Sequence, residues 1–399
     1  MSRSPVTRGL GSTRAAPRAL VALAAVAVAA ATAVFAASAA PPANPGSGAP
    51  GSANGQLGLV GMDHVGITVP DVDEAVSWFE NVMGCVAPLT FGPFSGVQDL
   101  LDVDPLAVVH QITMVRCGRS ANIELFHYTA PDQRSDPPKN SDWAGYHIAF
   151  YVTDIDAAVD YMVAHGAQKL AGPLPVTEGP AAGQTINYFK TPFGTYIELI
   201  SYPSGMAYER DPSRPLWSPK RNGTDPVVTS VPGLLGIDHI GITVPNVGKA
   251  VSWFENALGC TSPLAFGPFS GVGAVLDVDP AAVIEHIQHV RCGNGPSVEL
   301  FEYTAPGQDQ SFRRNSDIGG KHLAFYVRHI DKAVARLTAL GAEKLAGPLP
   351  VTEGPAAGQT INYFKTPFGT YIELISYPQG EAYAATAAIP LWDPRDNRP

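Results

Sequence analysis

The sequence predicts an α+β fold made of four copies of one module, in which a strand and a helix are followed by about three more strands. The first observation is a stretch that starts at His64, HVGITVPDVDEAV, and has variants that start at His147, His239 and His322. The second is that every module ends in a strand-like segment with one glutamate between apolar residues. The third is that the second half of the chain repeats the first at a constant offset of 175 residues. Antiparallel-rich sheets with helices on one face follow from this order.

Each module opens with a strand and a helix whose patterns are clear in the first copy. Residues 64–69 alternate with the period of a half-buried strand. Asp71 or Asp73 can cap the helix that follows, and apolar side chains recur at helical spacing between Val72 and Phe79. The remaining strands of the module are separated by glycine and proline turns.

The first forty residues have the pattern of a secretory signal peptide. Four arginines precede an apolar run over residues 19–37, and Ala37-Ser38-Ala39 fits a cleavage site for small residues. The alternative is an uncleaved membrane anchor, but a run made mostly of alanine is a weak membrane span. Residues 41–58, rich in Pro, Gly, Ser, Ala and Asn, are expected to form a flexible linker. The sequence thus predicts a secreted or periplasmic protein.

The mature chain is acidic. Cleavage after residue 40 removes four arginines and no acids, which leaves 36 acidic against 22 basic residues and a net charge of −14. Such a protein is a poor ligand for nucleic acid or anionic lipid, and no later segment is apolar enough to stay in a membrane. The expected partner is a small molecule.

The repeats define the expected domains. Domain 1 covers residues 59–203 and domain 2 covers residues 234–378, and residues 169–203 recur letter for letter at 344–378. The segments 204–233 and 379–399 also correspond to each other, and each is expected to dock on its own domain with its tryptophan, Trp217 or Trp392, buried.

Four cysteines occupy equivalent places in the two halves. Export permits the disulfides Cys85–Cys117 and Cys260–Cys292, and free buried thiols are the equal alternative. A cysteine metal site is disfavoured because the chain has no closely spaced CxxC pair.

One histidine and one glutamate recur at the same places in all four modules. The histidine opens the first strand, and the glutamate lies within an apolar last strand, where a bare carboxylate is costly unless it is paired or binds a cation. Alone, such a histidine is usually structural and such a glutamate usually faces solvent. Their joint recurrence favours metal binding, and two imidazoles with two carboxylates suit Zn, Ni, Co, Mn or Fe, at two sites per chain. The predicted ligands are His64, Glu124, His147, Glu198, His239, Glu299, His322 and Glu373.

These residues and repeats resemble the vicinal oxygen chelate (VOC) superfamily, which includes glyoxalase I, methylmalonyl-CoA epimerase, extradiol dioxygenases and bleomycin- or fosfomycin-resistance proteins. The resemblance covers residues 59–203 and 234–378. It implies βαβββ modules that pair into cupped sheets around a metal held by the first and last strands. The two-histidine, two-glutamate set is similar to that of glyoxalase I, whereas extradiol dioxygenases use two histidines and one glutamate. Glu124 and Glu299 therefore favour the isomerase and lyase branch.

The site then implies a reaction. A metal that chelates the vicinal oxygens of a hydroxy-carbonyl compound acidifies the neighbouring C–H bond and stabilises an enediolate. Glu198 and Glu373 are the predicted bases that remove and return the proton, with Glu124 and Glu299 as the alternative. Export argues against the intracellular glutathione and CoA substrates of the family and favours a free small molecule. An iron dioxygenase and a binding protein without turnover are the competing functions.

Several assignments stay open or secondary. His64 and Glu124 pair either with His147 and Glu198 or with His322 and Glu373, and a monomer is sufficient to form both sites. The strand and turn NYFKTPFGT, which contains Tyr188, Lys190, Tyr363 and Lys365 in its two copies, either lines the cup or faces solvent. The loop TEGPAAG is expected to form a rim or lid, because it lacks the Lys-Ser or Lys-Thr of a phosphate loop. The histidines that break the repeat are expected at the surface: His110, His286 and His289.

Overall fold

The computed structural model describes residues 57–211, 215–223 and 225–396. The predicted signal peptide and the predicted linker as far as residue 56 lie outside these residues. Among the helices of the described ranges, none is long and apolar enough to cross a membrane.

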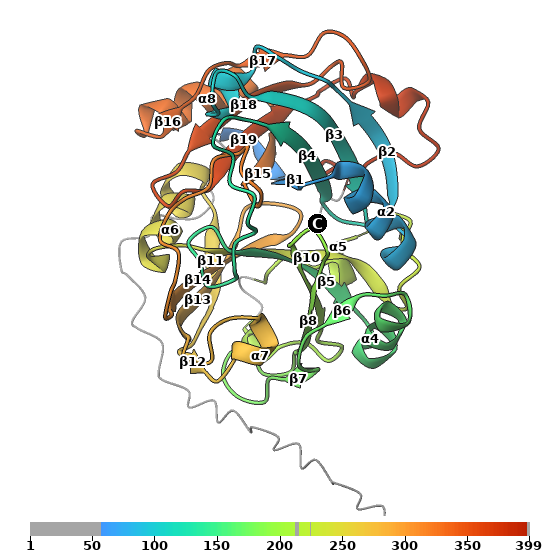
Figure 1. The fold of residues 1–399 in the computed structure, drawn as a ribbon, viewed down its shortest axis with the longest axis vertical. Helices are drawn as coiled ribbons and strands as arrows, with labels where there is room; N and C mark the ends of the chain where they lie inside the picture. The colour runs from blue at the N-terminus through green and yellow to red at the C-terminus, as the bar shows by residue number, and fades with distance from the viewer. Residues whose placement is uncertain (1–56, 212–214, 224, 397–399) are drawn as a thin grey trace, which may run out of the picture. The chain divides into compact units, whose positions relative to one another are not determined.

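The predicted α+β fold of four strand–helix–strand modules is confirmed (Figure 1). Modules 1 and 3 occupy residues 59–129 and 234–304 and share one element order. The elements of module 1 are β1 (Leu59–Thr68), α2 (Val72–Met83), β2 (Val86–Phe91), α3 (Gln98–Leu101), β3 (Val108–Arg116) and β4 (Asn122–Thr129). Those of module 3 are β10 (Leu234–Thr243), α6 (Val247–Trp253), η2 (Phe254–Leu258), β11 (Thr261–Phe266), β12 (Phe269–Ser270), α7 (Gly273–Leu276), β13 (Val283–Arg291) and β14 (Ser297–Thr304).

Modules 2 and 4 occupy residues 146–201 and 321–376 and also share one order. The elements of module 2 are β5 (Tyr146–Val152), α4 (Ile155–Ala164), β6 (Gln168–Lys169), β7 (Leu174–Pro175), β8 (Thr185–Lys190) and β9 (Tyr196–Ser201). Those of module 4 are β15 (Lys321–Val327), α8 (Ile330–Ala339), β16 (Glu343–Lys344), β17 (Leu349–Pro350), β18 (Thr360–Lys365) and β19 (Tyr371–Ser376). Short helices follow each half: η1 (Ala207–Arg210), α5 (Pro219–Asn222) and η3 (Ala382–Ala385).

Local chemistry explains where the helices begin. Asp71, one of the two caps considered, accepts a hydrogen bond from the Glu74 amide at 2.9 Å and starts α2. Asn246 caps α6 in the same way through the Lys249 amide. A polar cap just after the first strand therefore turns the chain into a helix in both halves.

The modules pair across the two halves. Sheet A has the order β16-β18-β19-β15-β1-β4-β3-β2, so it joins module 1 to module 4. Sheet B has the order β11-β13-β14-β10-β5-β9-β8-β6, so it joins module 2 to module 3. The first strands meet antiparallel in the middle of each sheet, and each last strand lies parallel to the first strand of its own module. Neither sheet therefore corresponds to one sequence repeat, 59–203 or 234–378. Of the two pairings considered, the structure has the one in which His64 and Glu124 of module 1 share a sheet with His322 and Glu373 of module 4.

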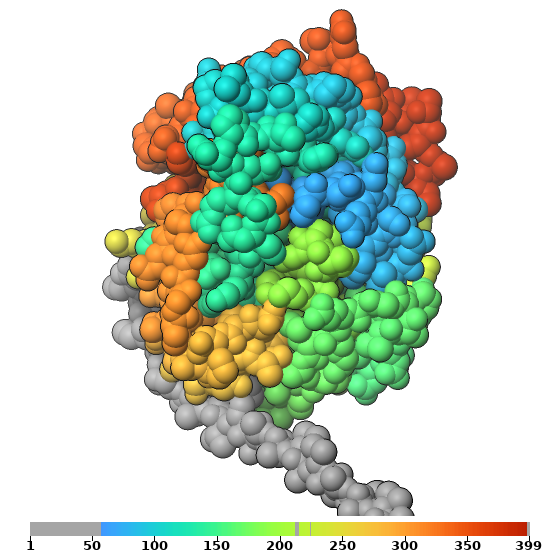
Figure 2. All heavy atoms as spheres, in the orientation of Figure 1, coloured from blue at the N-terminus to red at the C-terminus, as the bar shows by residue number. Residues whose placement is uncertain are grey.

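Two crossover loops account for the exchange. The loop after β4 carries the chain from sheet A to sheet B, and the loop after β14 carries it back; they lie side by side, green and orange, on the face shown in Figure 2. Arg134 donates to Asp309 at 2.6 Å, and Arg313 donates to Asp136 at 2.9 Å. These reciprocal ion pairs join the two loops where they meet, and modules 2 and 3, which follow each other along the chain, pair through the antiparallel strands β5 and β10.

The helices pack on one apolar core that includes residues of both sheets. Phe79, Ile155, Phe254 and Ile330 come from four different modules and belong to the same buried cluster. The core takes up one face of each sheet, and the opposite face carries smaller apolar clusters beside the recurring histidines and glutamates.

The predicted burial of the two tryptophans is confirmed, since Trp217 and Trp392 are each 1% exposed. The Trp392 amide donates to Asn122 Oδ1 at 3.0 Å, and Arg116 donates to the Pro390 carbonyl at 2.6 Å. Both partners belong to module 1, so the last segment docks on the sheet that its own module 4 shares with module 1. The cysteines form the disulfides Cys85–Cys117 and Cys260–Cys292, the pairing that the sequence left open against free thiols.

Lys321 is a buried cation between the modules. Its Nζ donates to the Ala144 carbonyl at 2.9 Å, and burial lowers the pKa of Lys321 to about 7. The unfolded chain holds this proton up to its ordinary pKa near 10.5, so it binds more protons than the folded chain between pH 7 and 10.5. We expect the free energy of unfolding to rise with pH in this window by up to about 5 kcal/mol. Urea unfolding at several pH values should show this rise in the wild type and not in Lys321→Met; an equal rise in both would contradict it.

Candidate metal centres

The eight recurring side chains form two buried clusters. Centre A contains His64, Glu124, His322 and Glu373, which all come from sheet A. The second cluster, centre B, contains the remaining four: His147, Glu198, His239 and Glu299. Each centre takes one histidine and one glutamate from each half, and both are complete within one chain.

Strand register brings each set together. On β1, Gly66 lies opposite His322 of β15 and beside Glu124 of β4. The His322 ring lies over the glycine, and a Cβ at Gly66 would be 1.9 Å from Cε1 of His322. In sheet B, Gly241 leaves the same space for His147. A strand glycine therefore permits the imidazole to reach the centre.

Gly66→Ala is expected to weaken metal binding at centre A about 10- to 100-fold, because the new methyl group displaces the His322 ring although no donor is lost. Metal titration by isothermal calorimetry measures this. Gly248→Ala in α6, where the added Cβ has ordinary contacts only, is the matched control and should leave the affinity unchanged. Unaltered affinity in Gly66→Ala would show that the ring does not need this space.

The donor atoms lie at the spacing of metal ligands. In centre A, Nε2 of His64 is 3.2 Å from Oε2 of both Glu124 and Glu373. The corresponding distances from Nε2 of His322 are 3.1 and 3.2 Å, and the two nitrogens are 3.3 Å apart. A regular tetrahedron with such edges has its centre roughly 2 Å from each corner, which is the length of a zinc bond to imidazole or carboxylate. Centre B has the same pattern, with distances of 3.0 to 3.4 Å.

One oxygen of each carboxylate, Oε2, has no partner apart from the histidines of its centre. These Oε2 atoms are buried and form no well-oriented hydrogen bond in any of the four glutamates: Glu124, Glu198, Glu299 and Glu373. A buried carboxylate oxygen left in this state is costly. The residues therefore fit a divalent cation in each centre.

A second set of residues orients the first histidine of each centre. Nδ1 of His64 is 2.8 Å from Asp63, whose other oxygen accepts a hydrogen bond from the Tyr377 hydroxyl. In centre B, Asp238 bonds His239 at 3.1 Å and accepts from Tyr202. These bonds place the Nδ1 proton on the carboxylate side and leave Nε2 free to face the cation. Sequence reasoning missed both aspartates, although the Asp-His pair occurs in both halves.

The charges within each centre are mutually compensated. Burial opposes protonation of His64, but the Glu124 carboxylate outweighs burial and raises the pKa of His64 well above its ordinary value. Burial likewise opposes ionisation of Glu299, but the histidines around it, His239 first, hold the pKa of Glu299 well below its usual range. A cation competes with these protons for the same donors, so binding it releases protons.

The tyrosines and lysines of the repeated segment NYFKTPFGT have different surroundings. Tyr188 and Tyr363 are buried, with their hydroxyls 3.4 and 3.3 Å from Nε2 of His147 and His322, so they line the centres. Lys190 and Lys365 instead form ion pairs at 2.6 Å with Asp277 and Asp102 near the surface. Of the two interpretations of NYFKTPFGT, lining the cup holds for the tyrosines, and facing solvent is closer for the lysines.

The prediction that His289 lies at the surface is wrong, whereas His110 is exposed and His286 is partly exposed. His289 is 4% exposed, and its Nε2 is 3.1 Å from Oε1 of Glu299. On β13 it lies directly opposite Glu299 of β14, so both side chains face centre B. Comparison of the two halves concealed this, because the corresponding residue at centre A is Met114.

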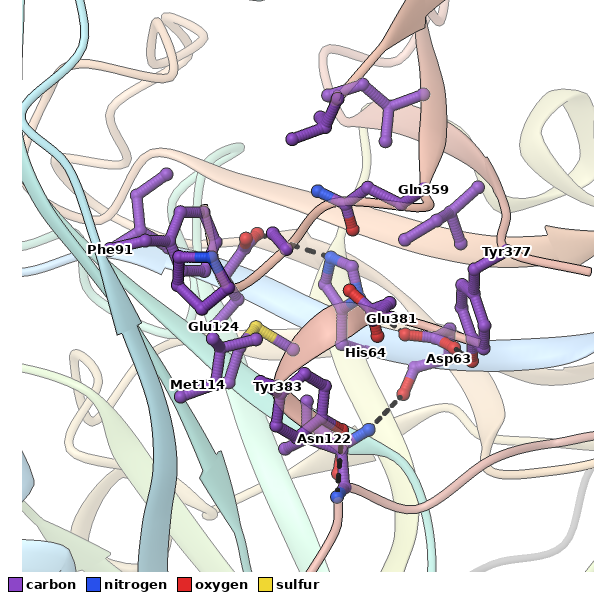
Figure 3. A pocket seen from close by; sticks show the side chains of 18 of the residues that line it. Asp63, His64, Phe91, Met114, Asn122, Glu124, Gln359, Tyr377, Glu381 and Tyr383 are labelled. Carbon is purple, nitrogen blue, oxygen red and sulfur yellow. Dashed lines mark hydrogen bonds and ion pairs between the residues drawn. The ribbon is translucent and has the colours of Figure 1, made fainter. Parts of the chain in front are cut away.

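A cavity of about 680 Å³ opens onto centre A and reaches His64, Glu124 and Glu373. This volume is in the range of small-molecule sites. Figure 3 shows Phe91 and Met114 on one side of it, and Glu381 on the side of Asp63 and Tyr377. Burial, followed by the negative charge of Asp63, raises the pKa of Glu381 to about 8.

Comparison with known proteins agrees with this geometry. The profile of the Glyoxalase/Bleomycin resistance protein/Dioxygenase superfamily matches residues 63–188 and again residues 238–363. A 2-epi-5-epi-valiolone epimerase from Actinomyces sp. is 42% identical over 177 residues, which are 42% of this chain and 93% of the relative.

One solved structure shows a similar fold. A glyoxalase I variant from Zea mays has a TM-score of 0.50 and 16% identity, over 79% of this chain and 92% of the maize chain. Glyoxalase I from Zea mays has a TM-score of 0.48 and 15% identity, over 79% and 92% of the two chains. The repeated profile match, with the epimerase relative, shows that this chain belongs to the glyoxalase/bleomycin resistance protein/dioxygenase (VOC) superfamily.

Proposed function

We propose that this protein is an exported, divalent-metal-dependent epimerase that inverts a hydroxyl-bearing carbon beside the carbonyl group of a small polyhydroxylated ketone. Family membership and 42% identity to an epimerase support an isomerase-type enzyme. The observation that carries the finer proposal is centre A, where two imidazoles meet two carboxylates whose Oε2 atoms form no well-oriented hydrogen bond, at the end of a cavity.

The roles of the residues follow from their positions. His64, His322, Glu124 and Glu373 would hold the cation, which would supply Lewis acidity to polarise the substrate carbonyl. We assign proton removal to the glutamates of the last strands of modules 4 and 2, Glu373 in centre A and its counterpart Glu198 in centre B. Inversion requires a proton to return on the opposite face of the carbon, and we assign this step to the second carboxylate of each centre, Glu124 or Glu299. Asp63 and Tyr377 keep the His64 ring in place.

The substrate class rests on the relative and on the cavity. The name of the relative denotes epimerisation of a valiolone, a cyclic ketone with several hydroxyl groups. A cavity of about 680 Å³ with both apolar and polar walls has room for such a ring. This agrees with the free hydroxy-carbonyl compound expected from the sequence.

The direct test is to incubate the purified chain with 2-epi-5-epi-valiolone in deuterated water, loaded in turn with Zn, Ni, Co, Mn or Fe. We expect epimer formation with deuterium at the inverted carbon, loss of both after removal of the metal with EDTA, and recovery when metal is restored. Oxygen consumption with bound iron would instead indicate a dioxygenase, and ligand uptake without exchange would indicate a binding protein. Turnover that persists after complete metal removal would refute the metal-dependent mechanism.

Export is part of this proposal. The disulfides Cys85–Cys117 and Cys260–Cys292 support it, because such bonds persist in oxidising compartments. Expression of the full chain in an exporting bacterium should yield a secreted or periplasmic protein whose N-terminus lies near residue 40. Recovery of the intact chain from the cytoplasm alone would contradict export.

A further inference from the structure

Centres A and B have the same four donors but differ in two neighbouring side chains. At the offset of 175 residues, His289 of centre B corresponds to Met114 of centre A. Glu381, which faces the cavity of centre A, corresponds to Met206 beside centre B. Each centre thus has one ionisable side chain where the other centre has methionine: Glu381 at centre A and His289 at centre B.

Met206 closes the apolar wall beside centre B. It is 6% exposed and belongs to a single buried cluster. The other members of that cluster are Ala149, Tyr151, Ile200, Tyr202, Leu216 and Leu264, with Ile186, Tyr208, Leu235 and Phe266 packed against them. One continuous apolar wall therefore covers this side of centre B.

The corresponding residues at centre A form two separate clusters. One contains Val60, Tyr326, Ile375 and Tyr377, and the other contains Leu89, Met114 and Tyr383. Residues of both clusters line the cavity, and Glu381 lines it with them (Figure 3). The carboxyl group of Glu381 thus interrupts an apolar wall that is continuous beside centre B.

His289 adds a second difference. It bonds Oε1 of Glu299 at 3.1 Å, and its other ring nitrogen is 3.1 Å from Ser297 Oγ. Glu299 is therefore held on its outer oxygen while Oε2 faces the cation position. Met114 offers no such donor to Glu124, so the carboxylate of centre A is not restrained in this way.

We propose that the two centres have separate tasks: centre A binds the substrate and Glu381 hydrogen-bonds one of its hydroxyl groups, whereas centre B, with Met206 at this position and His289 bonded to Glu299, holds a metal ion only. This inference rests on the proposed function and limits proton transfer to centre A. A cyclic polyhydroxylated ketone held at the metal by its carbonyl and the adjacent hydroxyl has further hydroxyls on the rest of the ring. Glu381 lines the cavity on the side of Asp63, and its carboxylate can accept a hydrogen bond from such a hydroxyl.

The test measures binding of 2-epi-5-epi-valiolone by calorimetry, together with metal content by atomic emission. We expect the metal-loaded wild type to hold two metal ions and to bind one ketone per chain. Glu381→Met, which copies the residue of centre B, should keep both metals and weaken ketone binding about 10- to 100-fold, the effect of losing a hydrogen bond to a polar ligand group. Glu381→Gln, which keeps a donor and an acceptor, should stay within about threefold of the wild type.

Glu343→Gln, on the exposed edge strand β16 and outside the cavity, is the matched control and should keep one ketone site of unchanged affinity. Two ketone sites of equal affinity in the wild type would overturn the separation of tasks. Wild-type affinity in Glu381→Met, with two metals present, would overturn the role of Glu381. No ketone binding by the metal-loaded wild type would instead remove the proposed substrate class, and with it the proposed function.

Discussion

Glu373→Gln is expected to lower kcat for epimerisation about 10³-fold at saturating metal, because glutamine keeps the shape of the side chain but cannot accept the substrate proton. Glu373 is suited to this role by its place at the cavity floor and by its carboxylate oxygen that forms no well-oriented hydrogen bond. Deuterium incorporation from solvent should fall in parallel with kcat, whereas the Kd for the ketone should change little.

Glu343→Gln on the exposed edge strand β16 is the matched control for this substitution and should have wild-type kcat. A comparison with Glu124→Gln separates the two carboxylates of centre A. If Glu373→Gln kept turnover within tenfold of the wild type while Glu124→Gln lost exchange with solvent, Glu124 would be the base, which is the alternative that the sequence left open.

His64→Ala combined with His239→Ala is expected to reduce the metal content from two equivalents per chain to none under conditions that load the wild type. Each substitution removes one of four donors, and it also leaves Asp63 or Asp238 without the imidazole that it orients. We expect metal affinity to fall more than 100-fold at each centre, a larger effect than the loss of a residue that only orients a ligand. His64→Ala alone should leave one equivalent and no epimerisation.

The loss of bound metal is measured by atomic emission, and its effect on stability is measured by thermal unfolding with and without EDTA. In the wild type, metal should raise Tm, because it binds the folded chain and the unfolded chain lacks the centres. His110→Ala removes an exposed histidine that bonds only Thr129 among the described residues, and it should keep both metals. Two equivalents of tightly bound metal in the double variant would rule out both centres as the binding sites.

The residues of the two centres were predictable because burying a carboxylate costs free energy, and a glutamate within an apolar strand is recognisable in the sequence. A glutamate between apolar strand residues needs a partner, and its recurrence with a strand histidine identified all eight residues that the structure brings together in centres A and B. Residues that act by packing or through a neighbour leave no such signal. His289 and Glu381 lie where the other half has methionine, so comparison of the halves made them look incidental. Asp63 and Asp238 were passed over because an aspartate beside a histidine is common at a surface.

The sequence by itself determined the α+β modules, the eight donor residues and the family, since these follow from periodicity and repetition within short segments. It left open which modules pair, because each module presents the same strand edge and the same polar face to either partner. The tertiary structure decided this through the crossover loops, where the ion pairs of Arg134 with Asp309 and of Arg313 with Asp136 bring distant segments together. It also placed Glu381 in the 680 Å³ cavity at centre A, whereas Met206, its counterpart at centre B, belongs to an apolar cluster.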